Sequence, residues 1–83
     1  MKGKHQRLLE AMRRKPTPRT LPWLDIENLL VSLGADVREG AGSAVSFRLK
    51  GHRLSLHRPH PRKEAKPYMV REVLDFLERA EVL

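Results

Sequence analysis

Hydrophobic and polar residues follow a helical spacing at the start of this chain. Residues 4–14 carry a short apolar stripe among basic residues, which predicts a helix packed by one narrow face. The stripe consists of Leu8, Leu9 and Met12. Pro16 and Pro18 follow, and since proline removes a backbone donor and restricts the residue before it, we expect residues 15–21 to form an irregular connector. The first helix should therefore be a peripheral appendage.

A second and stronger helical pattern begins after Pro22. Apolar residues recur there at helical spacing, and Gly34 supplies the left-handed residue that ends many helices. The recurring residues are Trp23, Ile26, Leu29, Leu30 and Leu33. Asp25 and Glu27 lie near the start, where carboxylates interact favourably with the helix dipole. We interpret these two acids as structural rather than as a catalytic pair, because residues two apart point to different faces of a helix.

Beyond Gly34 the spacing of apolar residues changes to two, as in strands with one buried face. The alternating positions are Ala35 and Val37, then Val45, Phe47 and Leu49, then Leu54 and Leu56. The glycine-rich residues 40–42 predict the turn of a first hairpin, and Gly51 with His52 predicts a second tight connection. Three sequential strands joined in this way form an antiparallel meander.

The last third of the chain begins with a cationic loop and ends with a helix. Residues 57–64 contain two prolines and mostly basic side chains, which predict an extended, exposed loop. Pro67 can occupy the first position of a helix, and apolar residues recur on one face from Tyr68 onwards. The resulting order is helix, helix, strand, strand, strand, helix. Packing the helices on one face of the sheet buries every apolar stripe, so the chain is predicted to be an α+β protein.

Length and charge narrow the range of functions. The chain has 83 residues, which fits a single domain over residues 1–83, and its formal net charge is +7. Residues 1–19 hold seven Lys or Arg and one acid, while residues 52–66 hold five and one. Clustered cations gain free energy by displacing counterions from nucleic acid, so a polyanion is the leading partner.

The sequence also argues against a disulfide-bonded, a secreted or a membrane-spanning protein. It contains no cysteine, which excludes disulfides, thiolate zinc sites and a cysteine nucleophile. No apolar run is long enough for a signal peptide or a membrane span. We therefore expect a cytoplasmic protein with no membrane partner.

Several short motifs occur in the order that one known family shows. A helix ends at Leu33 and Gly34, a Gly-Ser pair at residues 42–43 opens the middle strand, and the third strand runs into His-Pro-Arg-Lys-Glu at residues 60–64. In this order the chain resembles the HicA toxins of bacterial HicBA toxin–antitoxin pairs, whose fold is like a double-stranded RNA-binding domain. Residues 22–83 correspond to the α-β-β-β-α core. Residues 1–21, a helix and a Pro-rich connector, are similar to the additional segment of the longer members.

The resemblance implies an activity as well as a fold. HicA toxins are endoribonucleases that cleave mRNA without a metal or cofactor, and a HicB-type antitoxin neutralises them and offers a route to an oligomer. A histidine after the Gly-Ser pair acts as general base or acid, a role that suits imidazole near neutral pH. In this sequence that position is Ala44, which has no titratable group. The resemblance therefore implies a toxin that is inactive in this form.

Alanine at residue 44 has two explanations, which the sequence leaves open. It is either an inactivating substitution or the natural residue. In the second case the proton transfer falls to His57 or His60, which the third strand and its exit loop would bring beside Ser43. Of these two, His60 matches the histidine that the family carries before its Lys-Glu pair. The residues expected to bind RNA are Ser43, Arg58, Arg62, Lys63 and Lys66.

The histidines and aromatic residues also have interpretations that involve no catalysis. His57 and His60 would then only bind phosphate or face solvent, and His5 and His52, the latter in a turn, would have no chemistry. A zinc site built from His52, His57 and His60 is rejected, because their spacing fits no standard pattern and no cysteine supports it. Four aromatic residues, Trp23, Phe47, Tyr68 and Phe76, are expected in the core rather than as base-stacking platforms.

The sequence also leaves open two alternatives to a nuclease. The first is a non-catalytic RNA- or DNA-binding module in which Ala44 is natural. The second is a structural adaptor whose positive charge serves only solubility.

Overall fold

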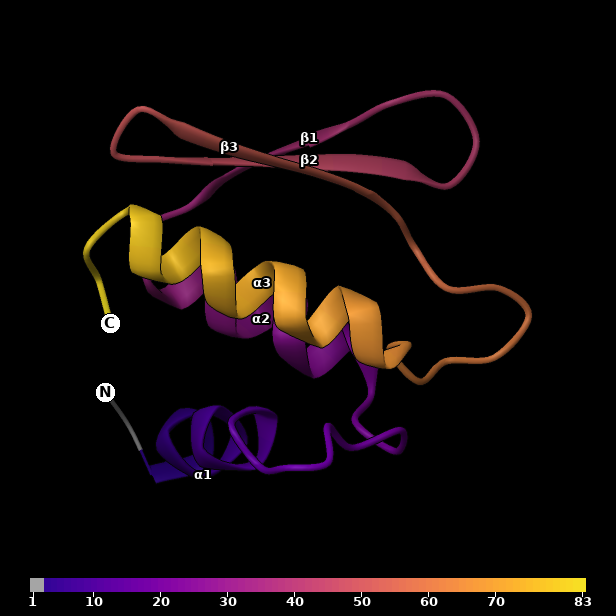
Figure 1. Ribbon diagram of the computed structural model, residues 1–83. Helices are drawn as coiled ribbons and strands as arrows, with labels where there is room; N and C mark the ends of the chain where they lie inside the picture. The colour runs from indigo at the N-terminus through magenta and orange to yellow at the C-terminus, as the bar shows by residue number, and fades with distance from the viewer. Residues whose placement is uncertain (1–2) are drawn as a thin grey trace.

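The computed structural model describes residues 3–83, which form three stacked layers (Figure 1). The elements in chain order are α1 (Gly3–Met12), α2 (Trp23–Ser32), β1 (Asp36–Glu39), β2 (Ala44–Leu49), β3 (His52–His57) and α3 (Pro67–Arg79). The strands form one antiparallel sheet in the order β1-β2-β3. Helices α2 and α3 lie side by side against one face of the sheet, and α1 lies beneath them. The predicted α+β fold and its element order, like those of a double-stranded RNA-binding domain, are confirmed.

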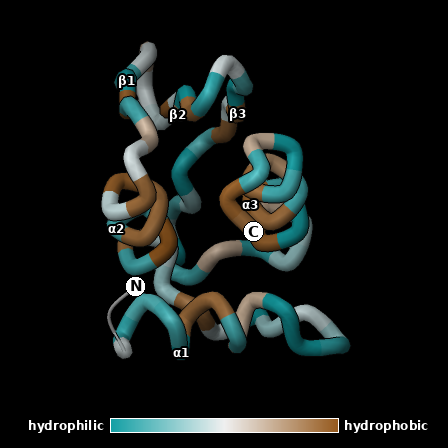
Figure 2. The backbone as a smooth tube through the Cα atoms, turned by 90° about the vertical axis from the view of Figure 1, so that its left-hand side faces the viewer, coloured by the Kyte–Doolittle hydropathy of each residue, from teal (hydrophilic) through white to brown (hydrophobic). Residues whose placement is uncertain are grey.

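The core lies between the sheet and the α2–α3 layer, where the apolar stripes meet (Figure 2). Ile26, Phe47 and Phe76 are fully buried, one from α2, one from the sheet and one from α3. The rings of Trp23 and Phe47 meet edge to face with their centroids 6.2 Å apart, a favourable aromatic geometry. The alternation in the sequence therefore identified the buried face of β2 and β3 correctly.

Helix α1 is not the peripheral appendage that its short stripe suggested. Leu9 and Met12 are only 4% and 1% exposed, and Met12 belongs to the same core cluster as the sheet residues. The helix contacts both α2 and α3 on the side away from the sheet (Figure 1). An amphipathic stripe is buried against whatever apolar surface the fold leaves open, and here that surface is the underside of the α2–α3 pair.

Glycine residues lie in the connections between elements. Gly34, with φ of 99°, ends α2 as predicted. The turn between β2 and β3 consists of Lys50 and Gly51, with φ of 50° and 81°, as a two-residue hairpin turn requires. His52 was expected in this turn but instead begins β3, where it pairs with Leu49. The prediction was wrong by one residue because the turn takes Lys50 in the left-handed region.

The strand register decides which side chains face away from the helices. In β2 these are Ala44, Ser46 and Arg48, and in β3 they are Arg53, Ser55 and His57. Side chains of directly opposed residues lie on the same face of a sheet. Ala44 pairs with His57 at the end of the ladder farthest from the β2–β3 turn, so the fold places these two residues next to each other.

Candidate functional site

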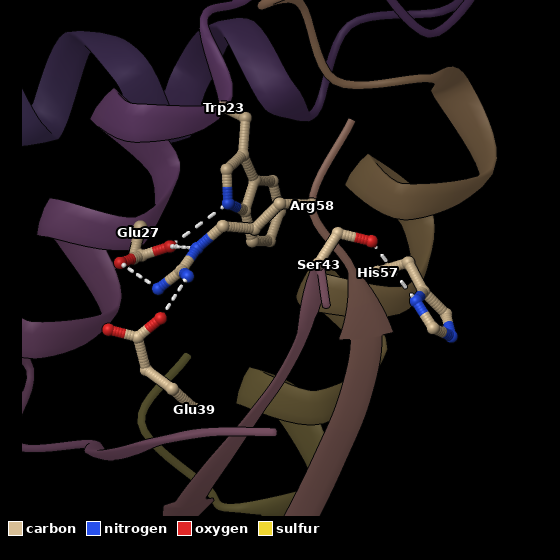
Figure 3. A network of polar contacts seen from close by, with 6 residues as sticks. All are labelled: Trp23, Glu27, Glu39, Ser43, His57 and Arg58. Atoms are coloured by element: carbon tan, nitrogen blue, oxygen red, sulfur yellow. Dashed lines mark hydrogen bonds and ion pairs between the residues drawn. The ribbon is translucent and has the colours of Figure 1, made fainter. Parts of the chain in front are cut away.

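The β1–β2 turn and the exit of β3 meet at one end of the sheet. Ser43 Oγ lies 3.2 Å from Nδ1 of His57, whose side chain stands beside the serine in Figure 3. The backbone N–H of Arg58 donates to the carbonyl of Ser43 at 2.8 Å. Ala44 is opposite His57 in the ladder. We call Ser43, Ala44 and His57 the strand-end site.

Residue 44 opens onto a concavity of about 390 Å³ on the outer face of the sheet. A Cβ at Gly40 would lie 3.1 Å from the Cβ of Ala44, closer than nearly all such contacts. Glycine at residue 40 therefore leaves space around the side chain at residue 44. A side chain longer than alanine can extend from there into the concavity, which His57 also lines.

A second cavity, of about 250 Å³, also adjoins His57. Ser43, His60 and Lys66 are among its lining residues. The structure thus brings both candidate histidines to one place, but it is His57 that contacts the serine hydroxyl. Sequence reasoning preferred His60, whereas the geometry favours His57. The catalytic role of each stays a prediction.

Tyr68 lines this second cavity and is 47% exposed. The expectation that all four aromatic residues lie in the core is therefore wrong for Tyr68, although it is confirmed for Trp23, Phe47 and Phe76. Tyr68 stands in the first turn of α3, where the helix emerges from the exposed loop, and its neighbour Met69 takes the buried position.

Arg58 is held by two carboxylates (Figure 3). Its Nε and Nη2 donate to the two carboxylate oxygens of Glu27 at 3.0 Å each, and its Nη1 donates to Glu39 at 2.6 Å. Glu27 also accepts from Nε1 of Trp23 at 3.0 Å. The hydrogen bonds from Glu27 and then from Glu39 raise the pKa of Arg58 above its ordinary value, because they stabilise the charged guanidinium. We call Arg58, Glu27 and Glu39 the arginine clamp.

The clamp fixes the geometry of the strand-end site. Arg58 directly follows His57, so its bonds to α2 and to the end of β1 tie the exit of β3 in place. Glu27 was interpreted through the helix dipole, but the structure gives it this specific partner instead. Nothing local in the sequence signals the clamp, because its partners are 31 and 19 residues away from Arg58. That Arg58 also contacts RNA stays a prediction.

The other predicted RNA-binding cations lie around this site rather than within it. Lys66 lines the cavity with Ser43, whereas Arg62 and Lys63 are exposed on neighbouring surfaces. The loop is attached to the start of α2, since the N–H of Trp23 donates to the carbonyl of Lys63 at 2.9 Å. The structure therefore orders a cationic loop beside the strand-end site.

Some residues of this region were missed in the sequence. Arg38 and Arg53 line the same concavity as Ala44, together with Ser46 and Ser55. The available signal was their position on the polar side of each alternating strand. It becomes informative only once the strand register shows that these side chains share one face.

Residues 3–83 contain no group of three His, Asp or Glu side chains placed to hold a metal ion. Within the same range, every helix is too short or too polar to cross a membrane.

A three-stranded meander with helices on one face and a polar site at one end defines a small α+β domain like those that bind double-stranded RNA. The family model of the HicA toxin of bacterial toxin–antitoxin matches residues 23–82. This chain belongs to the HicA toxin family and is thus the toxin of a toxin–antitoxin system, with an antitoxin as its partner. No curated protein and no solved structure was found to match it. The match begins at the first residue of α2, so α1 lies outside it, and membership of the longer subtype stays a prediction.

Proposed function

We propose that this chain is a toxin built to cleave mRNA without a metal, and that Ala44 deprives it of one of the two proton-transfer groups that the reaction uses. The observation that supports this most directly is the placement of His57. Its imidazole lies 3.2 Å from the Ser43 hydroxyl, directly across the ladder from Ala44. A histidine at residue 44 would have a second imidazole as its neighbour.

Metal-free cleavage of RNA uses the 2′-hydroxyl next to the scissile phosphate as nucleophile. A base takes the proton of this hydroxyl, its oxygen attacks phosphorus, and the bond to the 5′-oxygen breaks while an acid gives that oxygen a proton. The products are a 2′,3′-cyclic phosphate and a 5′-hydroxyl. Imidazole serves both roles near neutral pH, so His57 supplies one and a histidine at residue 44 the other. Lys66, beside His57, stabilises charge on the phosphate.

The surroundings of the site suit a single RNA strand. Tyr68 offers an exposed ring on which a base can stack, and His60 and Lys66 line the same cavity. Arg62 and Lys63 extend the cationic surface along the loop. Contacts of this kind are made mainly to the sugar and phosphate, which favours a weak sequence preference. An acidic antitoxin surface would compete for the same cations.

Restoration of the missing group tests the proposal. We expect Ala44→His to cleave a labelled mRNA in the presence of EDTA and to leave 2′,3′-cyclic phosphate ends, while the original chain leaves the RNA intact. Induced expression of Ala44→His should also arrest growth, and coexpression of the antitoxin should relieve the arrest. Ala44→Gln is the matched control, since glutamine is long and polar but carries no titratable group.

The non-catalytic RNA- or DNA-binding module remains the second candidate, and alanine at residue 44 is what favours it. This module predicts that Ala44→His binds RNA as the original chain does but never cleaves it. Cleavage by Ala44→Gln at the same rate as Ala44→His would also contradict the nuclease proposal, because it would show that the proton transfer does not depend on imidazole.

A further inference from the structure

The outer face of the sheet carries unpaired arginines. Helices cover only the opposite face (Figure 1), and Arg38, Arg48 and Arg53 are all exposed. Within residues 3–83 the ion pairs are formed by Arg58 and Arg79, and none of these three arginines takes part in one. The outer-face positions of the described strands include one carboxylate, Asp36, which is opposite Arg48 at the start of β1.

Two of these arginines are placed where they repel each other. Arg48 and Arg53 are direct partners in the β2–β3 ladder, so their side chains leave the same face next to each other. Like charges in directly opposed positions destabilise a sheet. Asp36 lies opposite Arg48 on the β1 side, but Arg53 is on the edge strand and has no carboxylate opposite it, so an anion bound beside Arg53 would reduce this repulsion. The pair therefore favours contact of this face with negative charge.

Arg53 lines two neighbouring concavities along β2 and β3, and we call these two concavities together the outer-face track. The concavity at Ala44 and His57 also includes Arg38 and Arg53, together with Glu39, whose carboxylate is paired with Arg58. A second concavity, of about 490 Å³, lies at the β2–β3 turn, and Arg53 lines this one as well, together with Lys50. A strand of six residues such as β2 spans roughly 20 Å at about 3.4 Å per residue. The track thus runs the length of the β2–β3 ribbon from the strand-end site to the turn.

The chemistry of the track selects one class of ligand. Protein interfaces have apolar and aromatic residues at their centre, whereas the outer-face positions between the arginines are Ser46 and Ser55. Arginine forks and hydroxyls suit the phosphates and sugar hydroxyls of a nucleic acid strand. We propose that the outer face of β2 and β3, with Arg38, Arg48 and Arg53 as its phosphate-binding residues, holds the RNA segment adjoining the scissile phosphate. This inference rests on the proposed nuclease function, and it adds a binding surface separate from the loop of residues 57–66.

Salt-dependent RNA binding tests the proposal. The probe is a fluorescein-labelled, unstructured 20-nucleotide RNA, and the double variant is Arg38→Ala/Arg53→Ala. We expect the affinity to fall about tenfold or more, and the slope of log K against log salt concentration to become shallower by about 1.4, since each phosphate contact on single strands contributes about 0.7. The matched control is Arg13→Ala/Arg14→Ala, which removes the same charge at two exposed residues directly after α1, a helix that lies on the far side of α2 and α3 from the sheet (Figure 1). Arg38→Lys/Arg53→Lys should retain most of the slope, because it keeps the charge.

Each outcome supports or overturns the inference. Equal losses in the test and control variants would show a general effect of net charge and would overturn it, as would an unchanged affinity of the Arg38→Ala/Arg53→Ala protein. Far-UV circular dichroism and a thermal melt verify that both double variants are folded. The same substitutions made in Ala44→His separate the two proposals: if that protein cleaves RNA equally well with and without Arg38 and Arg53, the nuclease function stands and the outer-face track is wrong. If Ala44→His neither binds nor cleaves RNA, both fail.

Discussion

At the scale of single residues, the backbone around residue 44 is held by hydrogen bonds that do not involve its side chain. The backbone of Ala44 still closes the β1–β2 turn, because its N–H donates to the carbonyl of Ala41 at 3.1 Å and its carbonyl accepts from Gly40 at 2.9 Å. These bonds do not depend on the side chain. A change of the side chain at residue 44 is therefore expected to leave this turn, and Ser43 beside it, in place.

The role of His57 can be separated from that of His60 in the Ala44→His protein. We expect His57→Gln to lower kcat for RNA cleavage by about 100-fold or more, as the loss of a general acid or base does, and to remove one limb of the pH profile. His60→Gln, the matched control in the same cavity, should lower kcat less than about tenfold and keep both limbs. The opposite ranking would assign the proton transfer to His60.

At the scale of elements, the arginine clamp joins β3, α2 and β1. The side chains of Arg58 and Glu27 are 29% and 15% exposed, so water compensates the loss of either partner only in part. The bond is bidentate, and such pairs of guanidinium and carboxylate are among the stronger ones in proteins. The clamp is therefore expected to contribute more to stability than an ion pair on the surface.

The substitution Arg58→Met tests the clamp because it keeps the aliphatic bulk and removes the charge. We expect it to lower the free energy of unfolding by about 2 kcal/mol, since it leaves the carboxylate of Glu27 partly buried without its partner. Arg79→Met is the matched control, because it breaks an exposed i,i+4 pair with Asp75 worth about 0.5 kcal/mol or less. Urea unfolding measures both. Equal destabilisation by the two substitutions would contradict the role of the clamp.

Features that depend on near neighbours in the chain could be predicted from the sequence, whereas contacts between distant elements could not. Alternating residues identified β2 and β3 and their buried face, and Gly34 marked the end of α2, because these features depend on near neighbours in the chain. The bonds of Arg58 to Glu27 and Glu39 depend instead on how three elements assemble. The same holds for the outer face, where alternation shows that Arg53 is exposed but only the register places it opposite Arg48.

At the scale of the whole molecule, the three layers separate the two sets of positive charge. The strands and the loop of residues 57–66 present cations at the sheet, whereas the exposed basic residues of α1 lie on the far side of α2 and α3 (Figure 1). Helix α1 is nevertheless part of the folded unit, because its Met12 lies in the common core. Loss of the packing of α1 should consequently affect the stability of the entire domain while the RNA-binding face stays the same.

The substitution Met12→Ala measures how firmly α1 belongs to the domain. Met12 is 1% exposed, and truncation of a fully buried methionine costs about 2–5 kcal/mol, so we expect a loss of this size in thermal or urea unfolding. Leu8→Ala is the matched control on the same helix, and it should cost clearly less because Leu8 is only partly buried. Below the melting temperature the affinity for RNA should be unchanged, since the α2–α3 layer separates α1 from the sheet (Figure 1). A cost for Met12→Ala no larger than that for Leu8→Ala would mean that α1 is a detachable appendage after all.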